Sequence, residues 1–373
     1  MGEKNVPGKA VVTEVPVPTA GSCRDRDSRF YGFLAGGAKT RLLEGLLDLG
    51  LPELLSAEGP MTAQALCTKL ELHPDRGWKF LHLLAMSGLL IEQGGGRGHD
   101  DAVYSLSDDA KYFFGDDGKQ GYFLRDLVDY WRRVSMLPLA DVLRGMPLPE
   151  AVRWPPPDEK AAEHLETWMR LTAGGAIKAL VNSSAMSGAR TLLDAGGGDG
   201  TMGCALVDQY PGLRVTVFNL AASACIARRT IAGHEKAQAV TVHEGNFLKD
   251  ELPAGFDRVL FSRVLTDWAP DVCVMLLEKA RRALADGGRV VIVEALVDGN
   301  LDCAISWEFR YVFYDSFGRA VFKPLRVYCE LLADAGLEVV RVTPMTDDTF
   351  YSVIEAAPAY PPLAKGGQGG SKP

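Results

Sequence analysis

The sequence predicts an α/β protein with a mainly parallel, doubly wound sheet, preceded by a smaller helical module. Short apolar runs alternate with helix-like patterns between residues 189 and 356, which is the order of strands and helices in a parallel sheet. A glycine-rich stretch, Asp194–Gly200, joins the first of these runs to the first helix. Leucines recur at helix spacing in the N-terminal part, which predicts a separate helical domain.

The composition of the chain excludes several classes of protein. The chain has 373 residues, 47% of them apolar, which is enough for two cores. A net charge of −8 argues against binding along a nucleic-acid backbone. Seven scattered cysteines without a CxxC pair indicate reduced thiols. We expect a cytoplasmic protein with no membrane span, no signal peptide and no metal site.

The N-terminal third predicts a flexible arm (1–25) and a winged helix (26–120). Leucine spacing indicates a helix within Phe30–Leu54, short helices over Ala63–Leu70 and Arg76–Leu90, and a glycine-tipped hairpin with its returning strand at Val103–Leu106. A winged helix could bind DNA, but only three basic residues lie between residues 61 and 90. Dimerisation is the favoured role, with a DNA-binding regulator as the last-ranked alternative.

A helical linker (121–185) then leads into the α/β domain (186–358), and residues 359–373 predict a flexible tail. One helix is expected over Glu159–Asn182. Its Trp168 and Met169 are either core residues or the lining of a pocket. Strands are expected at 190–195, 213–218, 239–244, 257–262, 288–295, 338–344 and 350–356, and helices at about 201–209, 221–232, 271–285 and 325–335.

The glycine loop and the strand ends predict where a ligand binds, because ligands of such sheets lie beyond the carboxyl ends of the strands. Gly196, Gly198 and Gly200 form GxGxG, which by itself is a weak signal. An acidic residue is expected about 20 residues after such a loop, to bind ribose hydroxyls, but Asn219 stands there. The later strands lead to Asn246 and to the segment Ser262–Trp268.

The stretches LLDAGGGDGT, VTVFNLA, HEGNFL, VLTDW, ALADGGRVVIVEAL and LLADAGLEVV resemble one known family. It comprises small-molecule O-methyltransferases, among them plant caffeate and mammalian hydroxyindole methyltransferases and many from bacterial antibiotic pathways. The resemblance extends from about Phe30 to Ala357. It implies a homodimer in which a winged-helix dimerisation domain precedes a class I methyltransferase domain. S-adenosylmethionine (SAM) is then the cofactor and S-adenosylhomocysteine the product.

The resemblance also implies site residues. Glycines of the loop would cradle the methionine part of SAM, the second strand end would hold the ribose, and the third would flank the adenine. Further contacts would come from the fourth strand end and the segment after it, and one helix would line the acceptor pocket. The implied cofactor residues are Gly196, Gly198, Asn219, Leu220, Asn246, Phe247, Ser262, Arg263 and Trp268, and the implied substrate residues are Trp168, Met169 and Phe322.

The departures from the family pattern concern catalysis. The family usually carries LHDW, whose histidine deprotonates the acceptor, but this chain has Thr266 at that position, and a neutral hydroxyl is no general base near pH 7. Of two glutamates that usually orient the histidine, Glu294 matches the first and Phe322 replaces the second. Two acidic cofactor positions are Asn219 and Asn246, which predicts weaker SAM binding. The predicted catalytic set is Glu294, Thr266 and Asp267.

We therefore expect SAM-dependent O- or C-methylation of a small hydroxylated aromatic, a natural-product intermediate. Glu294 is the remaining candidate base or orienting carboxylate, or else a structural strand-end residue. The alternative function is a methyltransferase fold repurposed for non-methylating chemistry, as in a hydroxylase or pericyclase. His164 is a minor candidate base, and His243 is expected to be structural. Arg310, Lys323 and Arg326 either pair with a substrate carboxylate or form a solvated face.

Overall fold

The computed structural model describes residues 26–94, 102–114, 119–148, 155–298, 301–313, 322–346 and 349–359. The predicted arm (1–25), the hairpin tip beyond Gly94 and residues 360–373 of the predicted tail (359–373) lie outside the described residues. The chain divides into two compact units, Met1–Asp116 and Asp117–Pro373, each described by itself below.

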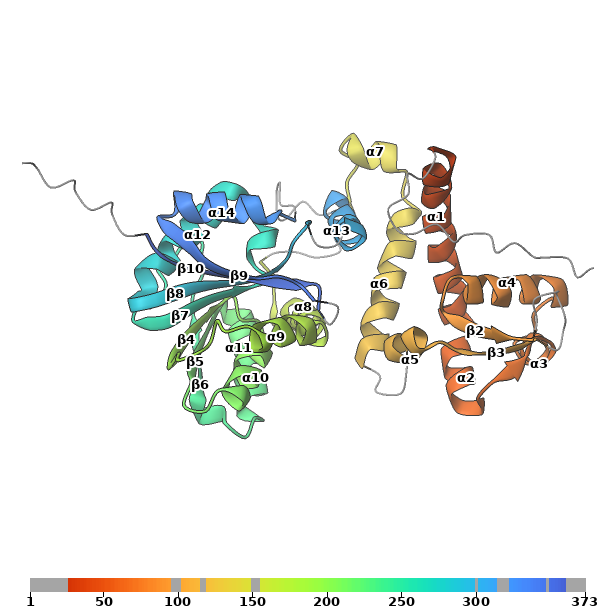
Figure 1. Cartoon of the computed structure of the whole chain (residues 1–373), viewed down its shortest axis with the longest axis horizontal. Coiled ribbons are helices and arrows are strands. Elements are labelled where there is room, and N and C mark those ends of the chain that lie inside the picture. The colour runs from red at the N-terminus through yellow and green to blue at the C-terminus, as the bar shows by residue number, and fades with distance from the viewer. Residues whose placement is uncertain are drawn as a thin grey trace, which may run out of the picture. The chain divides into compact units, whose positions relative to one another are not determined.

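The first unit is a small helical domain with a three-stranded antiparallel sheet of order β1-β3-β2. Buried leucines of four helices and two strands form its core. Its elements are α1 (Arg26–Asp48), α2 (Leu51–Glu58), β1 (Met61–Thr62), α3 (Ala63–Lys69), α4 (Pro74–Met86), β2 (Leu90–Gln93), β3 (Val103–Leu106) and α5 (Asp108–Phe114) (Figure 1).

Two of the helix expectations in this unit are wrong in extent. The helix expected within Phe30–Leu54 is interrupted, because Gly50 takes a left-handed φ of 63° and α2 begins anew at Leu51, with Pro52 in its first turn. The helix expected to reach Leu90 ends at Met86, since Gly88 has a φ of 80°. Leu90 begins β2 instead.

The second unit opens with four helices: α6 (Lys119–Ser135), α7 (Leu139–Leu143), α8 (Glu159–Leu171) and α9 (Ala173–Asn182). The single helix expected over Glu159–Asn182 is wrong, because the chain breaks at Thr172 (φ −101°, ψ 4°). The Thr172 hydroxyl donates to the Trp168 carbonyl at 2.9 Å, and such local bonds compete with continuation of a helix.

The α/β part confirms the predicted sheet. Seven strands run in the order β6-β5-β4-β7-β8-β10-β9, with only β10 antiparallel to its neighbours. The strands are β4 (Thr191–Ala195), β5 (Arg214–Asn219), β6 (Val240–Glu244), β7 (Phe256–Ser262), β8 (Leu284–Ala295), β9 (Leu337–Thr343) and β10 (Tyr351–Pro358). Between them lie α10 (Thr201–Gln209), α11 (Ala221–Ala232), α12 (Pro270–Ala283), α13 (Leu301–Glu308) and α14 (Leu325–Asp334), with 3₁₀ turns η1 (Ala237–Ala239), η2 (Leu265–Asp267) and η3 (Phe309–Phe313).

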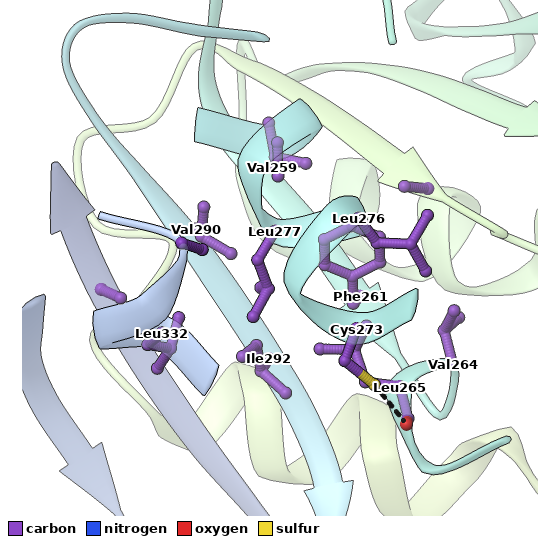
Figure 2. Close-up of a cluster of buried hydrophobic side chains, with 14 of the residues drawn as sticks. Val259, Phe261, Val264, Leu265, Cys273, Leu276, Leu277, Val290, Ile292 and Leu332 are labelled. Atoms are coloured by element: carbon purple, nitrogen blue, oxygen red, sulfur yellow. Dashed lines mark hydrogen bonds between the residues drawn. The ribbon is translucent and has the colours of Figure 1, made fainter. Parts of the chain in front are cut away.

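Helices cover both faces of this sheet, with α12 and α14 on one and α9, α10 and α11 on the other (Figure 1). The central strands are therefore apolar on both sides. Along β7, Val259 and Phe261 face α12, while Leu260 faces the opposite layer. Figure 2 shows the first of these cores, where Leu276 and Leu277 of α12 meet the strand side chains.

The strand order changes direction at β4, because β5 lies on one side of it and β7 on the other. The connections after these strands leave the sheet on opposite sides, so a crevice opens at their carboxyl ends. The glycine loop after β4 and the segment after β7 both lie at this edge.

Candidate active site

The glycine loop lies at the floor of a cavity of about 1100 Å³ at the carboxyl edge of the sheet. Gly196, Gly198 and Gly200 all have left-handed φ angles, 81°, 57° and 85°. A Cβ at Gly198 would lie 2.8 Å from Glu166 Oε2, and one at Gly196 would lie 3.0 Å from a Val264 methyl group. Both the backbone conformation and the close packing therefore require glycine at these positions.

The two strand-end amides line the same cavity, but they are engaged with the backbone. Asn219 accepts a hydrogen bond from the Leu220 N–H at 2.8 Å and donates to the Gly198 carbonyl at 3.3 Å. Asn246 accepts from the Leu248 N–H at 2.9 Å. Each amide thus shapes its loop, a role that an acidic residue could share only as acceptor.

The remaining predicted cofactor residues also gather here. Leu220, Phe247, Ser262, Arg263 and Trp268 all line the cavity. The rings of Phe247 and Trp268 meet edge to face at 5.9 Å. The Ser262 Oγ atom is buried without a hydrogen-bond partner among the described residues, so a bound ligand can satisfy it.

Two buried carboxyls in this cavity were not singled out by the sequence. Glu166 of α8 and Asp194 of β4 are 4% and 1% exposed, and each has one oxygen with no partner in the described part of the chain. Burial raises the pKa of each to about 7. A signal for Glu166 was present, because it precedes Met169 by three residues and so shares its helix face.

These features fit SAM. The glycine loop admits a ligand to within contact of the backbone, and the first turn of α10 presents N–H groups beside it. Unpartnered carboxyl oxygens of Glu166 and Asp194 suit a cationic ligand, and the Ser262 hydroxyl offers a further polar contact.

Arg263 connects β7 to the α8–α9 junction. Its φ of 57° is unusual for a residue with a Cβ, and its N–H donates to the Val293 carbonyl at 2.9 Å. The guanidinium donates to the Thr172 hydroxyl at 2.6 Å and to the Met169 carbonyl at 2.7 Å. Although Arg263 lines the cavity as expected, its hydrogen bonds are to the protein and hold α8 in place.

A second cavity, of about 830 Å³, adjoins the first and shares Leu165, Met169, Arg263 and Asp267 with it. All three predicted substrate residues, Trp168, Met169 and Phe322, line this space. The indole N–H of Trp168 donates to the Asp126 carboxylate of α6. Aromatic rings make up much of the wall, which suits a flat apolar molecule: Trp168, Trp307, Tyr311, Phe322, Phe350 and Tyr351.

Glu294 ends β8 at this second cavity and is 1% exposed. Its Oε1 atom accepts the N–H of Val264 at 2.9 Å and that of Thr266 at 3.2 Å. Burial, followed by the nearby Asp267 charge, raises the pKa of Glu294 to about 8. Glu294 is thus mostly protonated at pH 7, and its main visible role is to hold the η2 turn.

Asp267 lies on the wall between the two cavities. Its carboxylate accepts a hydrogen bond from the hydroxyl of Tyr311, a residue that the sequence did not single out. Burial raises the pKa of Asp267, while Tyr311 and then the charge of Arg310 oppose that shift. Thr266, beside it, is buried at the second cavity.

The other polar candidates differ in exposure, in position relative to the cavities and in their partners. His164 is exposed and lines neither cavity, so it is not placed to act as a base. His243 stacks on Phe218 at 5.5 Å, in agreement with a structural role. Lys323 is buried and donates to the carbonyls of Leu265 and Thr266. Arg326 is exposed and pairs with Glu330, while Arg310 lines the second cavity.

The described residues contain neither a metal cluster nor a membrane-spanning helix. Among the described residues, no group of three or more His, Cys, Asp or Glu side chains is arranged to hold a metal ion. Within the same residues, none of the helices combines the length and apolar character that crossing a membrane requires.

Comparisons with known proteins agree with this architecture. Residues 153–314 match the family model of the O-methyltransferase domain. A 3-hydroxy-5-methyl-1-naphthoate 3-O-methyltransferase of Streptomyces sahachiroi is 30% identical over 316 residues, covering 81% of this chain and 87% of that protein. The chain belongs to the O-methyltransferase family. It is a SAM-dependent methyltransferase with an α/β fold, and SAM is its cofactor.

Two further relatives show the range of this family. The crystal structure of the SAM-dependent methyltransferase SibL in its apo form superposes with a TM-score of 0.71 at 25% identity, covering 89% of this chain and 99% of that one. The aclacinomycin 10-hydroxylase RdmB of Streptomyces purpurascens is 37% identical over 144 residues, 38% of each chain.

Replacing Glu294 by Gln should flatten the pH dependence of stability. The unfolded carboxyl ionises near its ordinary pKa of 4.5, whereas the folded one keeps its proton to about pH 8. The folded state therefore binds more protons in this window, and its stability falls as pH rises. Glu294→Gln removes up to about 1.4 kcal/mol per pH unit of that slope.

Urea unfolding at several pH values between 5 and 8 measures this slope. Glu338→Gln is the matched control, because Glu338 is exposed on β9, and it should follow the wild type. Parallel curves for Glu294→Gln and the wild type would show that Glu294 is ionised in the folded protein.

Proposed function

We propose that this enzyme transfers the methyl group of SAM to a small hydroxylated aromatic, an intermediate of natural-product synthesis. The observation that carries the proposal is the pair of adjoining cavities, one with the glycine cradle and one walled by aromatic rings, that share Met169, Arg263 and Asp267. The relative named as a naphthoate O-methyltransferase supports an aromatic acceptor.

We propose catalysis mainly by alignment, with the acceptor's proton taken up by Asp267. Bound SAM supplies an electrophilic methyl group, so much of the rate can come from orienting the acceptor. Thr266 is no base at neutral pH. Glu294 is mostly protonated and holds the turn. Asp267 borders both cavities, and its raised pKa makes it a stronger base than an ordinary aspartate.

Turnover tests this function directly. Purified enzyme is incubated with SAM and a panel of phenols, hydroxynaphthalenes and their carboxylic acids, and S-adenosylhomocysteine and product mass are measured. We expect both to appear together, and NMR of the product separates O- from C-methylation. SAM that binds but is not consumed with any acceptor would favour the non-methylating alternative, for which the hydroxylase relative is the precedent.

We also propose that Glu166 compensates for the missing acids at Asn219 and Asn246. Its unpartnered Oε2 atom lies against Gly198 at the loop that would hold the methionine part of SAM. Because its pKa in the free protein is about 7, a cationic ligand should bind best when Glu166 is ionised.

SAM affinity should therefore increase with pH toward 8, by up to about tenfold per unit below pH 7 for each carboxyl that must ionise. Glu166→Gln should weaken SAM binding at pH 8 and reduce this dependence, as measured by calorimetric titration. Glu163→Gln is the control, since Glu163 lies on the same helix but is exposed and near Arg229. Equal affinity and equal pH dependence for both variants would exclude a role for Glu166.

We propose a homodimer held by residues 26–120, with a pocket-forming linker over 121–185 and the catalytic domain over 186–358. Support comes from exposed apolar side chains on α1: Phe30, Tyr31, Phe33 and Leu34 are 61%, 66%, 82% and 56% exposed in the single chain. Such a contiguous apolar face usually marks an interface.

Light scattering during size exclusion should give twice the 40.4 kDa chain mass. Replacing Phe30 and Phe33 together by Glu should shift the protein to the monomer mass, because buried unpaired carboxylates are costly. Val340→Glu, at an exposed position of β9, should remain dimeric. A wild-type monomer would refute the proposal.

A cytoplasmic location is likewise a proposal. It is supported by buried, reduced cysteines such as Cys273, whose thiol donates to the Leu265 carbonyl at 3.2 Å (Figure 2).

A further inference from the structure

The second cavity, the one walled by aromatic rings and called the acceptor cavity below, contains a buried cation that no step of methyl transfer uses. Arg310, in η3, is only 7% exposed and lines this cavity. Its guanidinium carbon lies 3.9 Å from the ring centre of Trp307 and 5.6 Å from that of Trp168. Two aromatic faces thus hold the guanidinium in place through cation–π contacts.

The hydrogen-bonding capacity of Arg310 is largely unused. Its Nε atom donates to the Trp307 carbonyl at 3.5 Å, and in the described ranges no carboxylate lies within 4.0 Å of the guanidinium. Asp267 is near enough to feel its charge, but that carboxylate is bonded to Tyr311. Two guanidinium nitrogens therefore remain for a ligand, although buried arginines are normally paired.

The other cations nearby are already engaged. Lys323 is bound to the Leu265 and Thr266 carbonyls, and Arg263 to Thr172 and Met169. Beside these three positive side chains lie two carboxyls, Glu294, which is mostly protonated at pH 7, and Asp267, whose pKa burial also raises. The side chains around this cavity therefore include more cations than anions, and an anionic acceptor would balance them.

We propose that the acceptor is an aromatic carboxylate, bound through its carboxyl group by Arg310. This inference rests on the proposed function and names the substrate class of the same site. The planar guanidinium can donate two parallel hydrogen bonds to a carboxylate. The ring of the acceptor then lies among Trp168, Trp307 and Phe322, and Arg310 selects acids over neutral phenols.

The test compares acids with their primary amides, which have nearly the same shape without the charge. Hydroxybenzoic and 3-hydroxynaphthoic acids and the matching amides are titrated into the full chain with S-adenosylhomocysteine present, following tryptophan fluorescence. The wild type should bind each fitting acid about tenfold or more tightly than its amide. The proposal would be overturned if no acid in the panel binds more tightly than its amide.

Variants assign the preference to Arg310. Arg310→Gln should reduce it to less than about threefold, and Arg310→Lys should retain part of it, since a lysine keeps the charge without the fork. Arg326→Gln removes a charge from an exposed arginine paired with Glu330 and should leave the preference unchanged. The proposal would also be overturned if the Arg310→Gln variant prefers acids over amides by the same factor as the wild type.

The binding measurement separates this proposal from the proposed function. An acid preference without formation of S-adenosylhomocysteine would refute methyl transfer and leave the role of Arg310 intact. Equal turnover of neutral phenols and acids, without a binding preference, would refute the role of Arg310 and leave methyl transfer intact. The comparison of acids with amides on the wild type does not depend on the folding of any variant.

Discussion

The geometry of both cavities depends on the bonds from Arg263 to the junction of α8 and α9. The guanidinium holds the Thr172 hydroxyl and the Met169 carbonyl at the point where the helix breaks. This contact places α8 over the carboxyl edge of the sheet, so that Glu166 faces the glycine loop while Trp168 and Met169 face the acceptor cavity. The left-handed backbone of Arg263 is a local cost that the fold tolerates at this functional position.

A second constraint is the concentration of carboxyls at this edge. Glu166, Asp194 and Glu294 are buried with raised pKa values. Burial without a cation penalises the ionised form of each. If Glu166 and Asp194 contact the cationic cofactor as we propose, ligand binding would stabilise their charged state. Binding of the cofactor and stability of the fold would then be coupled through these two groups.

The missing histidine changes the division of roles within the site. In the resemblance that the motifs imply, Glu294 would orient a base at position 266, yet here it holds the backbone of the η2 turn. In our proposals the polar functions fall instead to Asp267, which bonds to Tyr311, and to Arg310 between two indole rings. A site of this kind would rely on orientation and charge balance more than on a strong base.

Local sequence determined much of this protein. Apolar runs and the GxGxG loop predicted the strands of the sheet to within two residues, except that β8 begins at Leu284 rather than at 288. The reason is that a parallel strand must be apolar on both faces and a tight βα turn requires glycine. Strand-end positions likewise predicted the residues that line the cavities, since parallel strands end at one edge.

Only the tertiary structure decided the rest. The helix break at Thr172 has a local component, the bond from its hydroxyl to the Trp168 carbonyl, but only the fold brings Arg263, 91 residues away in the chain, to that hydroxyl. Arg310, Lys323 and Arg326 look alike in sequence, but burial and existing partners distinguish them: Lys323 bonds to backbone carbonyls, Arg326 forms a surface ion pair, and Arg310 lines a cavity. The pKa values of Glu166 and Glu294 arise from burial, which is a property of the packed fold.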